Sequence, residues 1–186
     1  ARGFADHILD HFPAQDSGFF DTSDDHETLI VRPRNVQDNA VPSGNGMAYK
    51  QLIRLAAYTG DHRYSDAAYS ALEKLANAMQ QYPQAFTESL NAVDMLVNGI
   101  NEVAVVGNPS DADTQALLDV TRKAFRPNVI VALSKTDVDG EATIPLLNYR
   151  VQRGGTPTVY VCRNFTCQMP VTTVDEVVNL LPEIPS

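Results

Sequence analysis

The chain has 186 residues, of which 44% are hydrophobic, and its formal net charge is −9 with a pI near 4.7. This is enough apolar sequence for one domain or two small ones. The acidic balance argues against nucleic acid and anionic membrane surfaces as partners, because both need clustered Lys and Arg. The longest apolar runs fall far short of the roughly 20 residues that span a bilayer, so we expect no membrane segment.

The first residues of the chain and the number of its cysteines indicate the expected cellular location. The first residues carry no charged-then-apolar signal segment, and two cysteines are too few for a disulfide-rich secreted module. A cytoplasmic location is therefore the expectation. The chain begins with Ala and enters a predicted helix almost at once, so we also expect it to be a piece of a longer polypeptide.

Apolar residues recur at helical spacing through the first half of the chain. A short helix is predicted over residues 4–12, and three amphipathic helices follow the loop after it. The break "TGDH" and the later Pro83 separate these three helices, as is typical of antiparallel hairpins with short turns. Within the loop, "TLIVR" at 28–32 predicts a short strand.

The period of the apolar residues changes near residue 102. "EVAVVG" and "NVIVAL" are continuous apolar runs, typical of covered strands, and a helix carrying Leu117 and Val120 lies between them. These segments predict one βαβ unit with a parallel strand pair and a right-handed crossover. "TPTVYVC" predicts a third strand, and Thr173 with Glu176 forms a capping box before a last helix.

The expected fold is therefore α/β by parts. Residues 1–101 form a helical hairpin region with a polar loop at 18–45, and residues 102–186 form a small α/β layer with parallel strands. The turn "GNPSDADTQ" has one glycine and no Gly-Lys-Ser/Thr, and Asp111 and Asp113 place negative charge where a phosphate would bind. We therefore expect a helix cap there and no nucleotide or other cofactor.

Cys162 and Cys167 form a C-x4-C pair at the end of the third predicted strand. Three interpretations stay open: structural thiols, which the pattern favours, a disulfide, or metal and redox chemistry. Redox catalysis favours C-x-x-C at a helix N-terminus, and a tetrahedral zinc site needs four ligands. The histidines lie about a hundred residues or more from this pair, so no metal is expected.

The polar loop mixes aromatic, acidic, amide and basic side chains, as is found where sugars bind. Aromatic faces cover the apolar side of a sugar ring, and paired carboxylates can perform acid/base chemistry. The candidate catalytic residues are Asp21, Asp38 and Arg32. The candidate substrate-binding residues are Phe20, His26, Arg34, Asn39, Ser43 and Asn45. Each of them also has a structural interpretation, such as accepting turn amides or pairing with the acidic run.

Three segments, "GFFDTSDDHETLIVRPRNVQDNAVPSGN", "LIRLAAYTGDHRY" and "YVCRNFTCQMP", together resemble the C-terminal part of the spermatogenesis-associated, YyaL-like family of thioredoxin-domain-containing proteins. Members look like a thioredoxin-like domain followed by a six-hairpin (α/α) toroid related to N-acylglucosamine 2-epimerases and glycosidases. The resemblance implies that the polar loop faces a cavity. This chain departs from the family pattern at Gly46, where a serine is usual, and it lacks the thioredoxin-like part.

The resemblance implies a fragment with the last hairpins of an incomplete toroid, supplying one wall of a carbohydrate-type cavity. The implied partners are a sugar ligand and the rest of the parent chain with its thioredoxin-like domain. Whether the whole protein is an enzyme stays open. As an enzyme, it would isomerise or hydrolyse a sugar.

Two other interpretations also stay open. The helices can form an interaction module that resembles a tetratricopeptide hairpin, or a scaffold for the missing thioredoxin-like domain. Helices without their neighbours would self-associate or repack into a compact bundle, because uncovered apolar stripes favour burial. The apolar positions concerned are Leu52, Leu55, Leu72 and Leu75.

Overall fold

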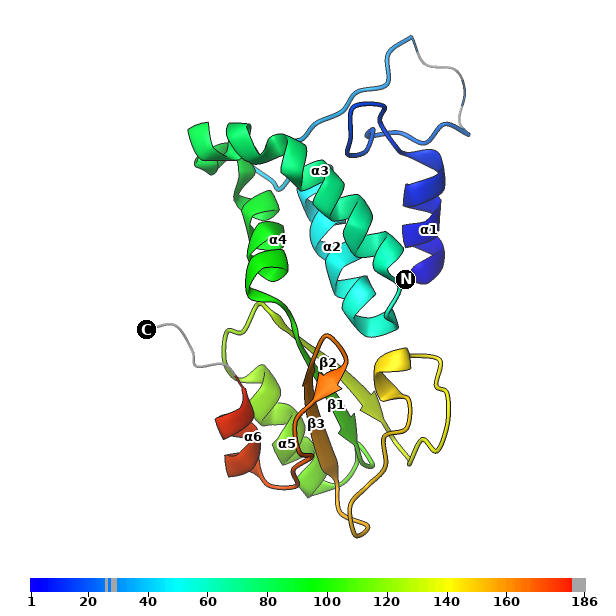
Figure 1. The fold of residues 1–186 in the computed structure, drawn as a ribbon, viewed down its shortest axis with the longest axis vertical. Helices are drawn as coiled ribbons and strands as arrows, with labels where there is room; N and C mark the ends of the chain where they lie inside the picture. The colour runs from blue at the N-terminus through cyan, green and yellow to red at the C-terminus, as the bar shows by residue number, and fades with distance from the viewer. Residues whose placement is uncertain (26, 28–29, 182–186) are drawn as a thin grey trace. The chain divides into compact units, whose positions relative to one another are not determined.

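The computed structural model describes residues 1–25, 27 and 30–181, and the chain divides into two compact units (Figure 1). The first unit comprises Ala1–Ala56 and Asp61–Asn98, and the second comprises Ala57–Gly60 and Gly99–Ser186. None of the described helices combines the length and apolar character needed to cross a membrane. The described residues form a mixed α/β structure.

The first unit is helical, as the apolar spacing predicts. Its elements are α1 (Arg2–His11), α2 (Gly44–Thr59), α3 (His62–Gln81), the 3-10 helix η1 (Pro83–Phe86) and α4 (Thr87–Asn98), with the end of α2 counted in the second unit. The "TGDH" break separates α2 from α3, and Asp61 caps α3 by accepting a hydrogen bond from the Arg63 amide. Pro83 opens η1, where its fixed φ is tolerated.

The core of the first unit is built from large side chains on successive helices. Tyr49, Tyr64 and Phe86 are almost completely buried. Leu52 and Leu72 are also buried, whereas Leu55 and Leu75 are half-buried. Burial of each such side chain contributes about 1.5–3 kcal/mol. Two of the four leucines predicted to drive self-association or repacking are therefore buried within this chain.

The prediction of a short strand over residues 28–32 is wrong for the part of that segment that the structure describes. Residues 28 and 29 lie outside the described part of the chain, and residues 30–32 adopt no strand conformation. Ile30 and Val31 are exposed, so they contribute no pleated surface to a core. An isolated strand has no ladder to stabilise it, and Pro33 removes a donor immediately afterwards.

The second unit contains one four-stranded sheet in the order β2-β1-β3-β4. Its elements are β1 (Asn101–Val106), α5 (Ala112–Arg122), β2 (Val129–Ser134), the 3-10 helix η2 (Pro145–Leu147), β3 (Thr158–Arg163), β4 (Thr166–Cys167) and α6 (Val174–Leu180). β1 and β2 pair in parallel with α5 between them in sequence, whereas β1 pairs antiparallel with β3, and β3 with β4. The sheet is thus mixed, and the prediction of a layer of parallel strands applies to one pair only. An apolar run marks a strand but does not encode its direction in the sheet.

The two faces of this sheet differ in chemistry. One face is apolar and lies against α5 and α6 (Figure 1). Its buried cluster consists of Val103, Val105, Leu117, Leu118, Val129, Val159, Val161, Val177 and Leu181. Side chains alternate along a strand, so Glu102, Tyr160 and Cys162 share the opposite face. These three side chains therefore lie on the face of the sheet opposite the apolar cluster.

Both predicted helix starts in the second unit are present. Thr173 caps α6, and Glu176 completes the capping box by accepting from the Thr173 amide at 3.1 Å. The hydrogen bonds from Thr173 and its neighbour lower the pKa of Glu176. Asp111 is the N-cap residue of α5, although its carboxylate accepts from the Asn108 side chain and makes no cap bond.

Candidate functional site

Asp38, a candidate acid/base residue, has both carboxylate oxygens engaged with the backbone. One oxygen accepts a hydrogen bond from the Ser43 amide at 2.8 Å, and the other accepts from the Glu88 amide at 2.8 Å. These amides lie at the start of α2 and of α4, where helical N–H groups lack partners within the helix. Asp38 therefore fastens the polar loop to two helix starts.

The other two candidate catalytic residues are engaged in a similar way. Both oxygens of Asp21 lie 3.2 Å from the Asn35 amide, which donates to them. Arg32 donates from Nη2 to the carbonyl oxygens of Thr22 and His11, and its guanidinium lies 4.3 Å from the centroid of the Phe20 ring. The structure thus places Phe20 beside Arg32 and gives Asp21, Asp38 and Arg32 separate backbone partners.

Asn45, at the end of the polar loop, makes four side-chain hydrogen bonds. Its side-chain oxygen accepts from the Phe19 amide at 2.8 Å and from the Tyr49 hydroxyl at 2.9 Å. Its side-chain nitrogen donates to the carbonyl oxygens of Phe19 and Asn35. Asn45 is only 2% exposed, so these four bonds occupy its full hydrogen-bonding capacity.

Ser43 and Asn39 complete the loop with local bonds. The Ser43 hydroxyl accepts from the Gly46 amide at 3.1 Å, and the Asn39 side chain accepts from the Ala40 amide at 2.9 Å. A Cβ on Gly46 would lie 3.0 Å from the Ser43 hydroxyl and 3.1 Å from Cβ of Glu88. The absence of a side chain at position 46 therefore suits this close approach. His26, the remaining candidate, lies outside the described residues.

A pocket of about 190 Å³ lies beside the loop in the first unit. It is lined by Asp16, Ser17, Arg34, Val36, Tyr49, Lys74 and Leu75. Arg34 donates from Nη1 to the Ser17 carbonyl at 2.7 Å, and Lys74 donates from Nζ to the Asp16 carbonyl at 2.8 Å. Each cation keeps further donors after making one such bond.

Tyr49 borders this pocket with a neutral ring that is fully buried. Burial raises the pKa of Tyr49 to about 12, although the positive charge of Arg34 acts in the opposite direction. Its hydroxyl is committed to Asn45, so the ring is held in place. Among the pocket residues, Arg34 belongs to the predicted binding set. Lys74 does not, because no pattern within α3 distinguishes it from a solvent-facing lysine.

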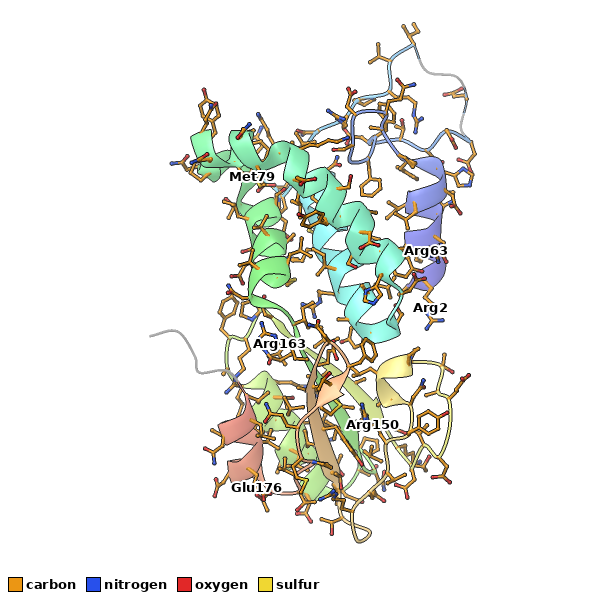
Figure 2. All side chains as sticks on the ribbon, in the orientation of Figure 1. Arg2, Arg63, Met79, Arg150, Arg163 and Glu176 are labelled. Carbon is orange, nitrogen blue, oxygen red and sulfur yellow. A yellow bond between two sulfur atoms is a disulfide. The ribbon has the colours of Figure 1, made fainter. Side chains whose placement is uncertain are left out.

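The two cysteines of the second unit form a disulfide. Cys162 on β3 and Cys167 on β4 lie opposite each other in the antiparallel ladder, with their Cα atoms 3.9 Å apart. The favoured interpretation as structural thiols is therefore wrong, and the disulfide alternative is the one found. Arg150 of the second unit is labelled in Figure 2. It donates to Sγ of Cys167 at 2.9 Å, and its guanidinium lies 4.9 Å from the Tyr160 ring centroid.

Glu102, which sequence reasoning did not single out, holds the turn between these strands. It is 2% exposed, and its carboxylate accepts from the Phe165 amide at 2.9 Å. Asn164 and Phe165 both have positive φ, at 50° and 60°, as a two-residue hairpin turn requires. Burial raises the pKa of Glu102, while the turn amides act to lower it.

Comparisons with known proteins support a relationship to a longer protein. No family model matches the chain. It is 28% identical to spermatogenesis-associated protein 20 of Mus musculus over 155 residues, which is 82% of this chain. Identity to the Homo sapiens protein of the same name is 27% over 155 residues, and identity to an uncharacterized Caenorhabditis elegans protein is 24% over 164 residues.

Most of this chain matches these relatives, but the match covers only a small part of each relative. The chain spans about a fifth of the length of the curated relatives that it matches, at 20% of the mouse and human proteins and 22% of the Caenorhabditis elegans protein. These similarities support homology between the chain and a segment of spermatogenesis-associated protein 20.

Proposed function

We propose that the first unit forms one wall of a carbohydrate-type cavity and binds a negatively charged sugar, such as a sugar acid. The observation that carries the proposal is the convergence of Arg34 and Lys74 on one pocket that also contains the buried Tyr49. In this account the helices are hairpins of an (α/α) toroid that the rest of a longer chain completes.

The pocket chemistry suits such a ligand. Arg34 and Lys74 supply charge-assisted donors, which suit a carboxylate better than a neutral hydroxyl. In the part of the chain that the structure describes, neither cation has an ion pair with a carboxylate side chain. Val36 and Leu75, which are both half-buried, offer apolar surface to the ring of a sugar. The volume of about 190 Å³ is below that of drug-sized sites and suits a single small ring.

The proposal assigns no acid/base step to Asp21 or Asp38. Both carboxylates accept hydrogen bonds from backbone amides, which hold them in place within the loop. A general acid or base instead needs to reach a proton on the substrate. Any sugar isomerisation or hydrolysis by the whole protein would therefore draw its acid/base groups from other parts of the longer chain.

The test is a calorimetric titration of the chain with glucuronic acid and, separately, with neutral glucose. We expect the acid to bind more tightly than glucose. Arg34→Gln and Lys74→Gln should each weaken binding of the acid about tenfold, which corresponds to about 1.4 kcal/mol. The matched control is Lys123→Gln at the C-cap of α5, a surface lysine in an exposed ion pair, which should leave binding unchanged.

Two outcomes would remove this proposal. One is the absence of glucuronic acid binding, and the other is binding that Arg34→Gln and Lys74→Gln leave intact. Loss of binding in Asp38→Asn at unchanged stability would instead support a ligand-contacting role for Asp38.

A second candidate function is a non-catalytic interaction or scaffold module for a thioredoxin-like domain elsewhere in the longer chain. The observation that favours it is a set of exposed apolar side chains around the polar loop, namely Ile30, Val31, Val41 and Met47. Such surface suits a partner better than solvent. Self-association of the isolated chain is part of this candidate, and sedimentation at several concentrations tests it.

A further inference from the structure

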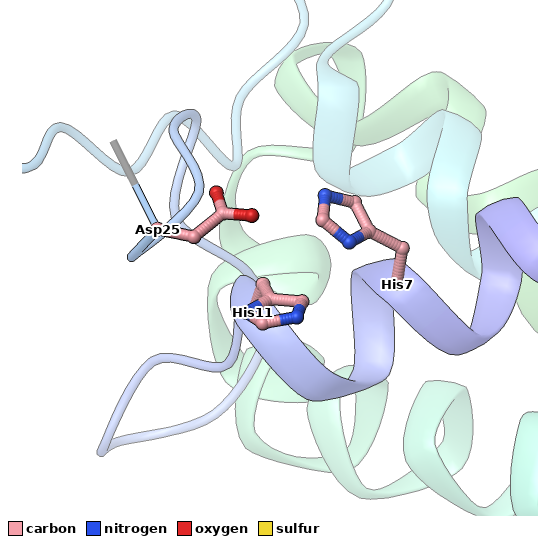
Figure 3. Close-up of side chains that lie close together, drawn as sticks. All are labelled: His7, His11 and Asp25. Atoms are coloured by element: carbon pink, nitrogen blue, oxygen red, sulfur yellow. The ribbon is translucent and has the colours of Figure 1, made fainter.

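Two histidines on α1 lie on one face of the helix. His7 and His11 are four residues apart, which brings side chains onto the same side of an α-helix. Their ring centroids are 4.6 Å apart (Figure 3). A pair of histidines without a third ligand is not yet a metal site.

The start of the polar loop supplies a third group. The Phe20 amide donates to the Phe12 carbonyl at 2.8 Å, and the Asp24 amide donates to the His11 carbonyl at 3.0 Å, so the loop returns to the end of α1. This return brings Asp25 to the histidines, with its carboxylate turned toward the His7 ring (Figure 3). One ligand atom from each of His7, His11 and Asp25 lies within 4.8 Å of the other two.

A neighbouring carboxylate orients one of these rings. Nδ1 of His11 lies 2.8 Å from a carboxylate oxygen of Asp24, within hydrogen-bond distance. Metal-binding histidines usually hold one ring nitrogen in such a bond and offer the other to the ion. The charges of Asp10, Asp24 and Asp25 all act on His11, so the surroundings of the cluster favour a cation.

We propose that His7, His11 and Asp25 form a binding site for a divalent transition-metal ion of the zinc class, with Asp24 as a positioning residue. Imidazole suits Zn²⁺, Cu²⁺, Fe²⁺ and Ni²⁺, and two imidazoles with one carboxylate are a ligand set that binds such ions. Mg²⁺ and Ca²⁺ prefer sites made only of oxygen ligands. Three protein ligands leave a coordination position for water or another small molecule.

The geometry requires a small closure. Bonds of about 2.0–2.1 Å to a tetrahedral Zn²⁺ place its ligand atoms about 3.3 Å apart. Atoms now up to 4.8 Å apart would therefore approach by no more than about 1.5 Å, a movement that rotation of exposed side chains can supply. His7 and Asp25 are exposed and His11 is half-buried, so this rotation disturbs no core.

The experiment is a competition titration of the chain with Zn²⁺ against a chromophoric chelator, together with visible spectra of the Co²⁺-loaded chain. We expect one Zn²⁺ per chain and Co²⁺ bands typical of low coordination number. His7→Gln, His11→Gln and Asp25→Asn should each weaken Zn²⁺ binding at least tenfold. Asp24→Asn should weaken it about tenfold, because it removes the partner of His11.

The matched control is His62→Gln, which changes an exposed histidine at the start of α3 and should leave Zn²⁺ binding intact. Far-ultraviolet circular dichroism verifies that every variant keeps its helical content. The proposal is overturned by a Kd above about 1 mM. It is also overturned if His7→Gln and His11→Gln leave Zn²⁺ binding unchanged, or if His62→Gln weakens it as strongly as they do.

Discussion

Different kinds of interaction stabilise the second unit and the polar loop of the first unit. In the second unit, residues 102–106 of β1 are buried, and apolar side chains from α5 and α6 cover one face of the sheet. The loop between α1 and α2 has no regular helix or strand in its described residues and depends on side chain to backbone hydrogen bonds. Polar variety in a loop therefore signals a ligand site only after the backbone hydrogen bonds have been accounted for.

The largest effect should come from the apolar core of the second unit. Leu118→Ala removes a side chain that is 2% exposed, and we expect a loss of about 2–5 kcal/mol in the free energy of unfolding. Urea unfolding measures it. Ala116→Ser, on the exposed side of the same helix, is the control and should cost less than about 1 kcal/mol. A loss below about 1 kcal/mol for Leu118→Ala would contradict the conclusion that apolar burial stabilises the second unit.

Asp38→Ala tests the polar loop in the same way. It leaves two amides at helix starts without a carboxylate, so we expect a loss of about 2–3 kcal/mol in the free energy of unfolding. Asp21→Ala is the matched control, because Asp21 is exposed and accepts from one amide, and it should cost less than about 1 kcal/mol. Equal losses for the two variants would show that Asp38 does not fasten the loop.

The disulfide should contribute less, because it closes a short loop. Reduction, or the double substitution Cys162→Ala with Cys167→Ala, should lower the free energy of unfolding by about 2 kcal/mol in the chain-entropy view. Thiol titration should find no free thiol in unfolded protein until a reductant is added. Two reactive thiols in unfolded protein without reductant would mean that the sulfurs are not bonded.

The smallest effect concerns pH. The pKa of Glu102 is raised by burial above its ordinary value of 4.5, so the folded state binds this proton more tightly than the unfolded state. The resulting contribution to stability is present at low pH and is lost as pH rises from the ordinary pKa through the folded pKa. Glu102→Gln keeps an acceptor for the Phe165 amide and should flatten this part of the stability profile. An unchanged slope in the variant would exclude Glu102 as its source.

Local patterns in the sequence were enough to predict the helices, the βαβ order and the capping box at Thr173, because helical spacing, continuous apolar runs and cap residues act over a few positions. They could not predict that β3 runs antiparallel to β1 or that Cys162 faces Cys167, since both depend on the path of the chain between strands. The composition of the loop marks its residues as candidate ligand contacts, but it does not predict the backbone groups that they bind.

The same limit applies to the candidate sites. Asp38 accepts an amide fifty positions further along the chain, and Asp25 reaches His7 only because the loop folds back on α1. Lys74 joins Arg34 because α3 runs past the loop. Contacts between distant segments decide which polar residues bind the protein's own backbone and which remain for a ligand.

The most direct test of the central claim is a nuclear magnetic resonance titration of the isotope-labelled chain with glucuronic acid, following every backbone amide. The claim is that the ligand binds where Arg34 and Lys74 meet, while Asp38 holds the loop to the starts of α2 and α4. We predict saturable shifts centred on residues 16–17, 34–36 and 74–75. Shifts centred on the Asp21 and Asp38 amides, with Lys74 and Leu75 unmoved, would contradict the account.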